Sequence, residues 1–225
     1  MLFNSINFAL FLPIVFILYW ALSRKSLTYQ NILLLCASYF FYACWDWRFL
    51  FLLIFSTALD YFTGLKIHQS NKDTTRKFWF WLSVLTNLGF LAVFKYYNFF
   101  AGSLSEGLNS VGFQPDFVFL EVILPVGISF YTFHGLSYVI DIYNRRIEPE
   151  RNIIHYSLFV SYFPLLVAGP IERATHLLPQ VKKKRNFDYT KAIEGVHQII
   201  WGLFKKVVMP INIWLKSKTK KIHSD

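Results

Sequence analysis

Long apolar runs alternate with short polar stretches along the whole chain, and this pattern predicts its elements. Each run is separated from the next by charged residues, glycines or prolines. A helix needs about 20 mainly apolar residues to cross a hydrocarbon core of ~30 Å, and most of the runs approach that length. The sequence therefore predicts an all-α, polytopic transmembrane protein. Its apolar segments are 6–22, 29–45, 49–67, 78–100, 117–143, 153–168 and 192–214.

The composition supports this interpretation and argues against a soluble domain. Of the 225 residues, 55% are hydrophobic and 20% aromatic, and the mean hydropathy is +0.38. Charged residues make up only 16% of the chain, whereas soluble domains carry about 25%. A soluble chain of this length could not bury nearly every segment in one core. Most of the tryptophans also fall at segment ends, as in the aromatic belt of a membrane protein.

The distribution of basic residues orients the segments. The net charge of +10 could indicate a nucleic-acid ligand, but the basic residues do not form one stripe. They flank the apolar segments, as expected for loops that face anionic headgroups. The basic stretches 24–25, 66–77 and 145–151 are therefore assigned to the cytoplasmic side. The 101–116 loop holds no lysine or arginine, so we expect it outside, and the N-terminus is then extracytoplasmic.

The sixth segment, 153–168, does not fit a simple alternation of crossings. It is short, contains Pro164, and precedes the strongest basic block of the chain, 173–191. A crossing would place that block outside, whereas a re-entrant segment over 153–170 keeps it inside. We therefore expect about six crossings plus one re-entrant segment. Because broken backbone at membrane depth must be surrounded by protein or a water-filled cavity, this segment is expected to border a site.

Ionisable residues inside the predicted spans are costly unless they are paired or functional. Asp60 and Lys95 lie near span ends, where they could snorkel to the surface or pair. His134 lies among aromatic residues, where a hydrogen-bonded core histidine is commoner than a catalytic one. Glu172 and Arg173 could form an interfacial ion pair. The sequence shows no metal-ligand spacing, phosphate-binding glycine loop or nucleophile elbow. The other intramembrane carboxylates are Glu121 and Asp141.

Two stretches of the chain carry a family signature. The first is Pro125–Phe133, which reads PVGISFYTF, and the second is Phe163–Arg173, which reads FPLLVAGPIER. Together with the shorter stretches MLFNS, SYFFY and DYFTG, they resemble the membrane-bound O-acyltransferase family, and within it the bacterial alginate O-acetylation branch. The resemblance covers about residues 1–208.

The resemblance implies a membrane-embedded funnel through which an acyl group passes. In that family an acyl (acetyl) group from a cytoplasmic donor is transferred across the membrane to an extracytoplasmic polysaccharide such as alginate. Accessory acetylation proteins assist the transfer. The resemblance also implies the bacterial cytoplasmic (inner) membrane as the location, and no bound cofactor or metal. The candidate residues for the funnel or substrate path are His134, Asp141, Tyr143, Pro170, Glu172 and Arg173.

The chain departs from the family where catalysis is expected. The family's catalytic histidine lies in a later segment near a Trp-x-x-Trp-His motif, and no Trp-His pair occurs here. Residues 1–208 resemble the N-terminal part of the family domain, whereas the basic tail 209–225 does not. We expect this tail to arise from a truncation or a frameshift, and the alternative is a lysine-rich tail on a helix that stays on the cytoplasmic side. The funnel is then incomplete, and the chain alone is expected to lack acyltransferase activity.

Two other functions remain open at this point. A transporter or channel subunit would line a conduction path with Asp60, Lys95, Glu121 and Asp141. Ion flux through liposomes, abolished when Asp141 is neutralised, would favour it. A non-catalytic membrane scaffold for polysaccharide export would instead copurify with a partner and show neither flux nor transfer.

Overall fold

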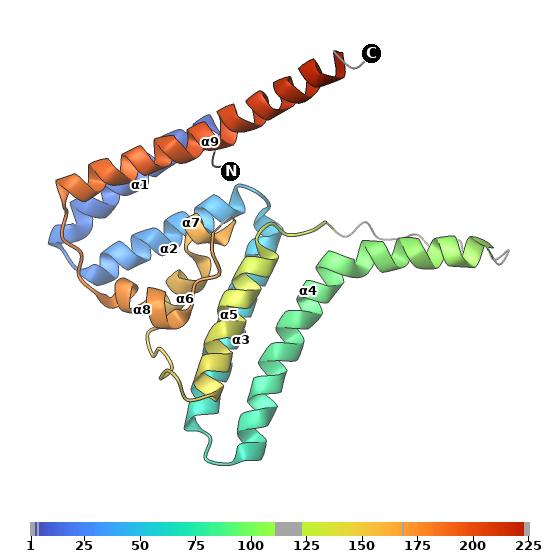
Figure 1. Ribbon diagram of the computed structural model, residues 1–225. Coiled ribbons are helices and arrows are strands. Elements are labelled where there is room, and N and C mark those ends of the chain that lie inside the picture. Colours follow the sequence, from blue (N-terminus) through green and yellow to red (C-terminus); the bar gives the residue numbers. More distant parts are fainter. Residues whose placement is uncertain (1–2, 4, 111–122, 168, 223–225) are drawn as a thin grey trace. The chain divides into compact units, whose positions relative to one another are not determined.

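The computed structural model describes residues 3, 5–110, 123–167 and 169–222 (Figure 1). All regular secondary structure within these ranges is helical, which confirms the predicted all-α class. The chain divides into two compact units. The first comprises Ile14–Lys183, and the second combines Leu2–Pro13 with Lys184–Asp225. The candidate site residues named above all belong to the first unit.

The helices follow the apolar runs, and one short helix is added after the sixth run. The helix of the fourth run extends from Asp73 to Ser110, so the predicted loop at 101–116 is wrong for residues 101–110, which are helical. Their bounds are α1 Ile6–Ala21, a 3-10 turn Leu22–Arg24, α2 Leu27–Ala43, α3 Trp47–Gln69, α4 Asp73–Ser110, α5 Ile128–Tyr143, α6 Ile153–Ser161, α7 Phe163–Leu166, α8 Ala174–Lys182 and α9 Tyr189–Ile222. Helix α9 therefore runs through the predicted boundary at residue 208.

Capping residues set the start of several helices. Asp46 accepts a hydrogen bond from the Arg48 backbone N–H (2.9 Å) and begins α3. Ser26 begins α2, and Asn152 begins α6 in the same way. A side-chain oxygen at this position satisfies an N–H group that has no partner in the first helical turn.

The fifth run becomes a helix later than its apolar pattern predicts. Helix α5 begins only at Ile128. The preceding residue, Gly127, has a positive φ of 77°, a conformation that does not occur inside a right-handed helix. A side chain at Gly127 would also overlap the backbone carbonyl of Leu166. Residues 117–122 of the predicted segment lie outside the described residues, as does Glu121.

The sixth run is broken, as predicted. Helix α6 ends at Ser161, and α7 begins after Tyr162 with Pro164 in its first turn. Proline has no N–H with which to continue α6, so the helix stops before it. The N–H of Phe163, freed by the break, donates to the hydroxyl of Ser38 on α2 (3.1 Å).

Helix α8 was not predicted. It lies in the basic block that we assigned to the cytoplasmic side, and it buries Ala174, Leu178 and Val181 on one face. The Val181 carbonyl accepts a hydrogen bond from the buried Asn31 amide of α2 (3.0 Å). A nine-residue helix with so few apolar positions gives only a weak periodic signal among many lysines.

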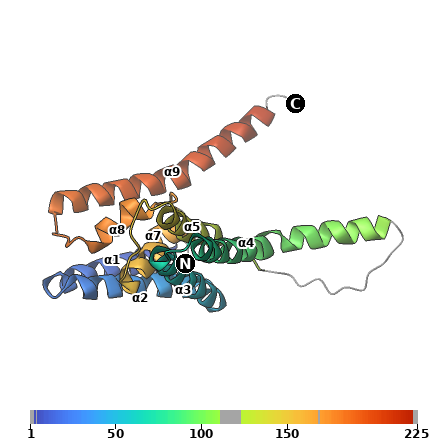
Figure 2. The ribbon, with the colours of Figure 1, turned by 90° about the horizontal axis from the view of Figure 1, so that it is seen from below.

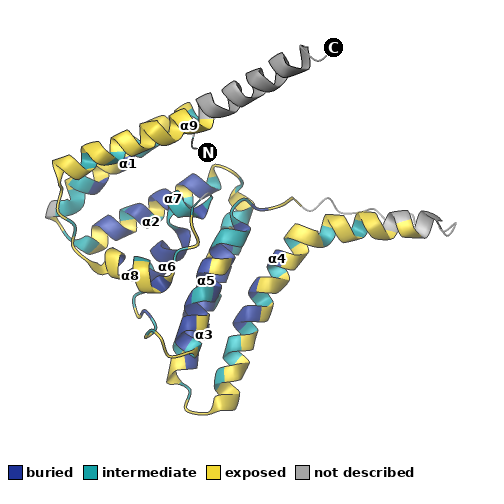
Figure 3. Ribbon diagram, viewed as in Figure 1, coloured by how far each residue is buried: buried dark blue, intermediate teal, exposed yellow. Residues whose placement is uncertain are grey.

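The core of the first unit is mainly aromatic. The rings of Tyr138 and Tyr156 lie 4.4 Å apart, and Phe159 lies 6.1 Å from Tyr156. None of the three has exposed surface. Helices α3, α4 and α5 lie next to one another, as Figure 2 shows from below. Figure 3 shows that buried positions gather on α2, α5 and α6, whereas α4 is largely exposed.

The exposed surface of the helices is strongly apolar. Of the described helices, α3 and the part of α4 up to Leu104 are long and apolar enough to cross a membrane. Large apolar side chains on α4 are exposed, including Trp81, Leu85 and Phe99. Extensive exposed apolar surface marks a contact with lipid or with another protein. The fold therefore supports membrane association, while the number of crossings stays a prediction.

Candidate functional site

A buried carboxylate joins α3 to α4. The Asp60 side chain is 1% exposed, and its Oδ1 accepts hydrogen bonds from Ser83 Oγ (2.6 Å) and Asn87 Nδ2 (2.7 Å). The Ser56 hydroxyl donates to Asn87 Oδ1 (2.6 Å), so the network returns to α3. Asp60 is therefore buried and does not snorkel to the surface, and its hydrogen-bond partners are neutral side chains rather than a cation.

Helix α5 closes over this carboxylate at a glycine. A side chain at Gly135 would overlap Asp60 Oδ2, so only a glycine allows α5 to approach α3 so closely. The Oδ2 atom makes no hydrogen bond with any residue that the structure describes. We call Ser56, Asp60, Ser83, Asn87 and Gly135 the polar centre.

His134, the neighbour of Gly135, is fully buried and serves as a hydrogen-bond acceptor. Its Nε2 accepts the backbone N–H of Glu172 (3.1 Å). A neutral imidazole that accepts at Nε2 carries its proton on Nδ1. The carbonyls of Pro170 and Val160 approach the ring, although Nδ1 makes no hydrogen bond of good geometry with any described residue. His134 thus ties α5 to the FPLLVAGPIER stretch, which confirms the interpretation as a core histidine.

The candidate residues of the second signature have separate roles. Pro170 and Glu172 lie at His134, whereas Arg173 is exposed at the start of α8. The predicted ion pair between Glu172 and Arg173 is wrong, because Glu172 Oε2 pairs with Nδ1 of His176 instead (2.9 Å). Residues four apart on a helical turn face each other, while direct neighbours diverge.

The other two candidates lie at the far end of α5. Asp141 is 4% exposed, and its Oδ1 lies 3.4 Å from Arg146 Nη1. The Tyr143 carbonyl accepts a hydrogen bond from Arg76 Nη2 (2.7 Å), and the Tyr143 ring stacks on the ring of Phe80. Nine residues of helix separate His134 from Tyr143, or about 14 Å. The predicted set therefore forms two groups rather than one site.

A buried ion pair between the α5–α6 loop and α8 was missed. Glu150 is 6% exposed and contacts the Lys182 ammonium, and its Oε1 accepts the Asn152 N–H (3.0 Å). Burial alone would raise the pKa of the Glu150 carboxyl, but Lys182, Asn152 and His155 together hold that pKa below its usual range. No local pattern marks this pair in the sequence, because Lys182 lies within a run of similar lysines.

Exposed apolar helices around a buried polar centre define a helical, membrane-associated protein. Along 92% of its residues, the chain is 41% identical to the probable alginate O-acetylase AlgI of Pseudomonas aeruginosa and 40% identical to that of Pseudomonas syringae pv. tomato. Along 94%, it is 34% identical to the peptidoglycan O-acetyltransferase of Helicobacter pylori. These similarities confirm the resemblance to the membrane-bound O-acyltransferase family.

The similarity covers only part of those relatives. The chain spans 39% of the length of either alginate O-acetylase and 45% of the Helicobacter pylori protein. No protein-family model and no solved structure matches the chain.

Proposed function

We propose that the chain takes part in transferring acetyl groups to hydroxyls of an extracytoplasmic polysaccharide. The observation that carries the proposal is the 41% identity over 92% of the chain to a probable alginate O-acetylase. The relatives are named for two acceptors, alginate and peptidoglycan. The proposed acceptor is therefore a polysaccharide hydroxyl. The donor is a cytoplasmic acyl compound, and accessory acetylation proteins assist.

The proposed topology is about six crossings of the bacterial inner membrane, with an extracytoplasmic N-terminus and a re-entrant segment over 153–170. Helix α6 has nine residues and α7 has four. At 1.5 Å per residue, α6 covers about 14 Å, which is half of the hydrocarbon core. The basic stretches before and after this segment then share the cytoplasmic side.

In this proposal, His134 positions the re-entrant segment and is not the general base. A general base needs a nitrogen that can reach the proton of the acceptor hydroxyl. His134 is fully buried, and its Nε2 already accepts the Glu172 N–H. The contact instead fixes the FPLLVAGPIER stretch against α5, where it can form one wall of the proposed acyl path.

The proposal is tested by deleting the gene in the organism that encodes it. Acetate released by mild alkali from extracytoplasmic polysaccharide measures ester-bound acetyl groups, and we expect this acetate to fall in the deletion strain. The wild-type gene should restore it, and so should a Gly89→Ala variant, because open space surrounds Gly89. Unchanged ester-bound acetate after deletion would contradict the proposal.

The transporter hypothesis gains no support from the described residues. Asp60 is enclosed by the polar centre, and Asp141 pairs with Arg146 at the end of α5. Lys95 is exposed on α4, with its Nζ 5.6 Å from the ring of Tyr96. These three residues lie in three separate environments, which does not favour a shared conduction path.

A further inference from the structure

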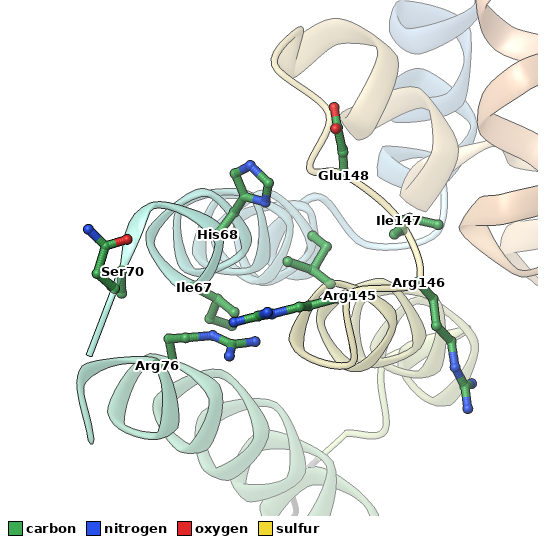
Figure 4. Close-up of a pocket in the computed structure, with 10 residues that line it drawn as sticks. Ile67, His68, Ser70, Arg76, Arg145, Arg146, Ile147 and Glu148 are labelled. Atoms are coloured by element: carbon green, nitrogen blue, oxygen red, sulfur yellow. The ribbon is translucent and has the colours of Figure 1, made fainter. Parts of the chain in front are cut away.

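A basic pocket of about 440 Å³ opens where α3 ends, α4 begins and α5 ends. Ile67 and His68 line it from α3, and Arg76 lines it from α4. Arg145 and Arg146 line it from the segment after α5. Figure 4 shows the side chains of Arg76 and Arg145 extending toward each other from different elements. We call this the basic pocket.

Arg76 is held in place before any ligand arrives. Its side chain is 13% exposed, its Nη2 donates to the Tyr143 carbonyl (2.7 Å), and its guanidinium lies 5.3 Å from the centre of the Tyr143 ring. Asp73 lies 3.7 Å away but is 84% exposed, so water screens this pair. An arginine fixed in this way loses little side-chain entropy when it binds an anion.

Arg145 occupies a backbone position that normally favours glycine. Its φ is +57°, and it is the one non-glycine residue with positive φ in the part of the chain that the structure describes. The Arg145 N–H donates to the Ile142 carbonyl (2.9 Å), and the Arg146 N–H donates to the Asp141 carbonyl (2.8 Å). These two hydrogen bonds form a Schellman motif, the helix C-terminus in which glycine usually occupies the position of Arg145. A long cation at such a position points to a use for its side chain.

The charges of the pocket are not balanced within the chain. Arg146 is paired with Asp141 at 3.4 Å, and Glu148 also lines the pocket. Among the described residues, no carboxylate pairs with the Arg145 guanidinium. Two guanidinium groups that approach each other repel unless an anion lies between them. The planar fork of arginine matches the oxygens of a phosphate group better than it matches a monatomic ion.

The position of the pocket indicates which anions can reach it. It lies between the end of α3 and the start of α4, the two described helices that are able to cross a membrane. It is therefore expected at the membrane surface, on the side where basic loops face anionic lipids. A second hollow of about 370 Å³ shares His68 and adds Arg151, which extends the same basic surface.

We propose that the basic pocket binds a phosphate group between Arg76 and Arg145. Two sources offer this chemistry: the headgroup of an anionic phospholipid, and a soluble phosphorylated compound. The proposed site does not depend on acetyl transfer, because it rests only on the geometry and the charge of the pocket.

The test measures the thermal unfolding of the full 225-residue chain in neutral detergent micelles. One arm adds phosphatidylglycerol, with phosphatidylcholine as its control. The other arm adds pyrophosphate, with sodium chloride at the same ionic strength as its control. We expect at least one anion to raise Tm by about 5 °C beyond its control at saturation. A rise with phosphatidylglycerol alone identifies the lipid source, and a rise with pyrophosphate alone identifies the soluble source.

Three variants link the shift to the pocket. Arg145→Gly suits the positive φ and should fold at least as well as the natural chain, but the Tm shift should disappear. Arg145→Lys should weaken apparent affinity about tenfold, because lysine lacks the fork. Lys25→Gln removes an exposed charge that does not line the pocket, so it should keep the full shift. The proposal is overturned if neither anion shifts Tm, or if Arg145→Gly keeps the shift.

Discussion

Helix α5 has polar surroundings at two places, and they differ in almost every respect. In its middle, Gly135 covers the Asp60 carboxylate, which takes hydrogen bonds from Ser83 and Asn87. Just past its end, Arg145 is exposed and has no charged partner among the described residues. The first group is closed by the chain itself, and the second is open to solvent.

This difference separates a polar group that holds helices together from one that is available to a ligand. Burying a polar group without a partner costs about 1–3 kcal/mol, so a buried carboxylate is kept only where neighbours donate to it. An exposed arginine carries no such cost, but a positive φ costs the chain energy that glycine would avoid. Substitutions in the polar centre should therefore change stability strongly, and substitutions of Arg145 should change mainly ligand binding.

The largest effect is expected for Gly135→Ala. The new methyl group would overlap Asp60 Oδ2, so either the carboxylate gives up its hydrogen bonds with Ser83 and Asn87 or α5 moves away from α3. We expect a loss of about 3 kcal/mol in the free energy of unfolding, the upper range for an overpacked core. The measurement is detergent-based unfolding followed by circular dichroism.

Gly89→Ala on α4 is the matched control for this substitution. A side chain at Gly89 would meet no atom within 4 Å, and alanine is the better helix former by about 1 kcal/mol. This variant should be as stable as the natural chain or slightly more stable. If both glycine variants lose the same stability, the close contact between α5 and α3 is not what stabilises the fold.

Asp60→Leu should have the next largest effect. It removes the acceptor for the Ser83 hydroxyl and the Asn87 amide, and we expect a loss of about 2 kcal/mol. Asp60→Asn keeps one oxygen that can accept both hydrogen bonds, so it should lose about 1 kcal/mol or less. Equal losses in the two variants would show that the charge of Asp60, rather than its acceptor oxygen, holds the helices.

The sequence predicted the helices far better than the contacts between them. An apolar run marks a helix by itself, which is why the run that contains α3 was found with nearly correct ends. The polar centre depends on residues from three helices that lie far apart in the chain, such as Asp60 and Gly135. Nothing local to Gly135 shows that a carboxylate lies against it. A single sequence therefore reveals that Asp60 needs a partner, but not which residue provides it.

The candidate site shows the same limit. The motif resemblance selected His134 and Glu172, and the structure brings them together through a backbone N–H. It also selected Asp141 and Tyr143, which lie at the other end of α5 because a rigid helix separates positions nine residues apart. The sequence does not single out Arg145 within the basic stretch 145–151, since its positive φ is a property of the folded backbone.

The Glu150–Lys182 pair combines features of the two places on α5. Its glutamate is buried and paired, like the polar centre, whereas its lysine is half exposed, and Arg145 at the open place is exposed as well. Lys182→Gln should lower stability near neutral pH by about 1 kcal/mol, since the lysine is half exposed. The folded state lowers the Glu150 pKa, so the pair stabilises the fold above the usual glutamate pKa of about 4.3. That contribution is lost as the pH falls through the lowered pKa. Unfolding curves of the two proteins should therefore converge in acid, and a difference that persists there would rule out the ion pair as its cause.

The smallest of these effects is expected for Arg145→Gly without added ligand, and it is a gain in stability. Glycine adopts a positive φ without steric cost, so this variant should gain about 0.5–1 kcal/mol in the free energy of unfolding. Arg146→Gly is the control at the next residue, which has no positive φ and pairs with Asp141. It should lose stability, because it gives up that pair and adds flexibility to the unfolded chain. If the free energy of unfolding rises in Arg145→Gly and falls in Arg146→Gly, the backbone at position 145 favours glycine, and the arginine there does not serve stability. A loss of stability in Arg145→Gly would instead mean that the arginine serves the fold, and the contrast between the two places on α5 would disappear.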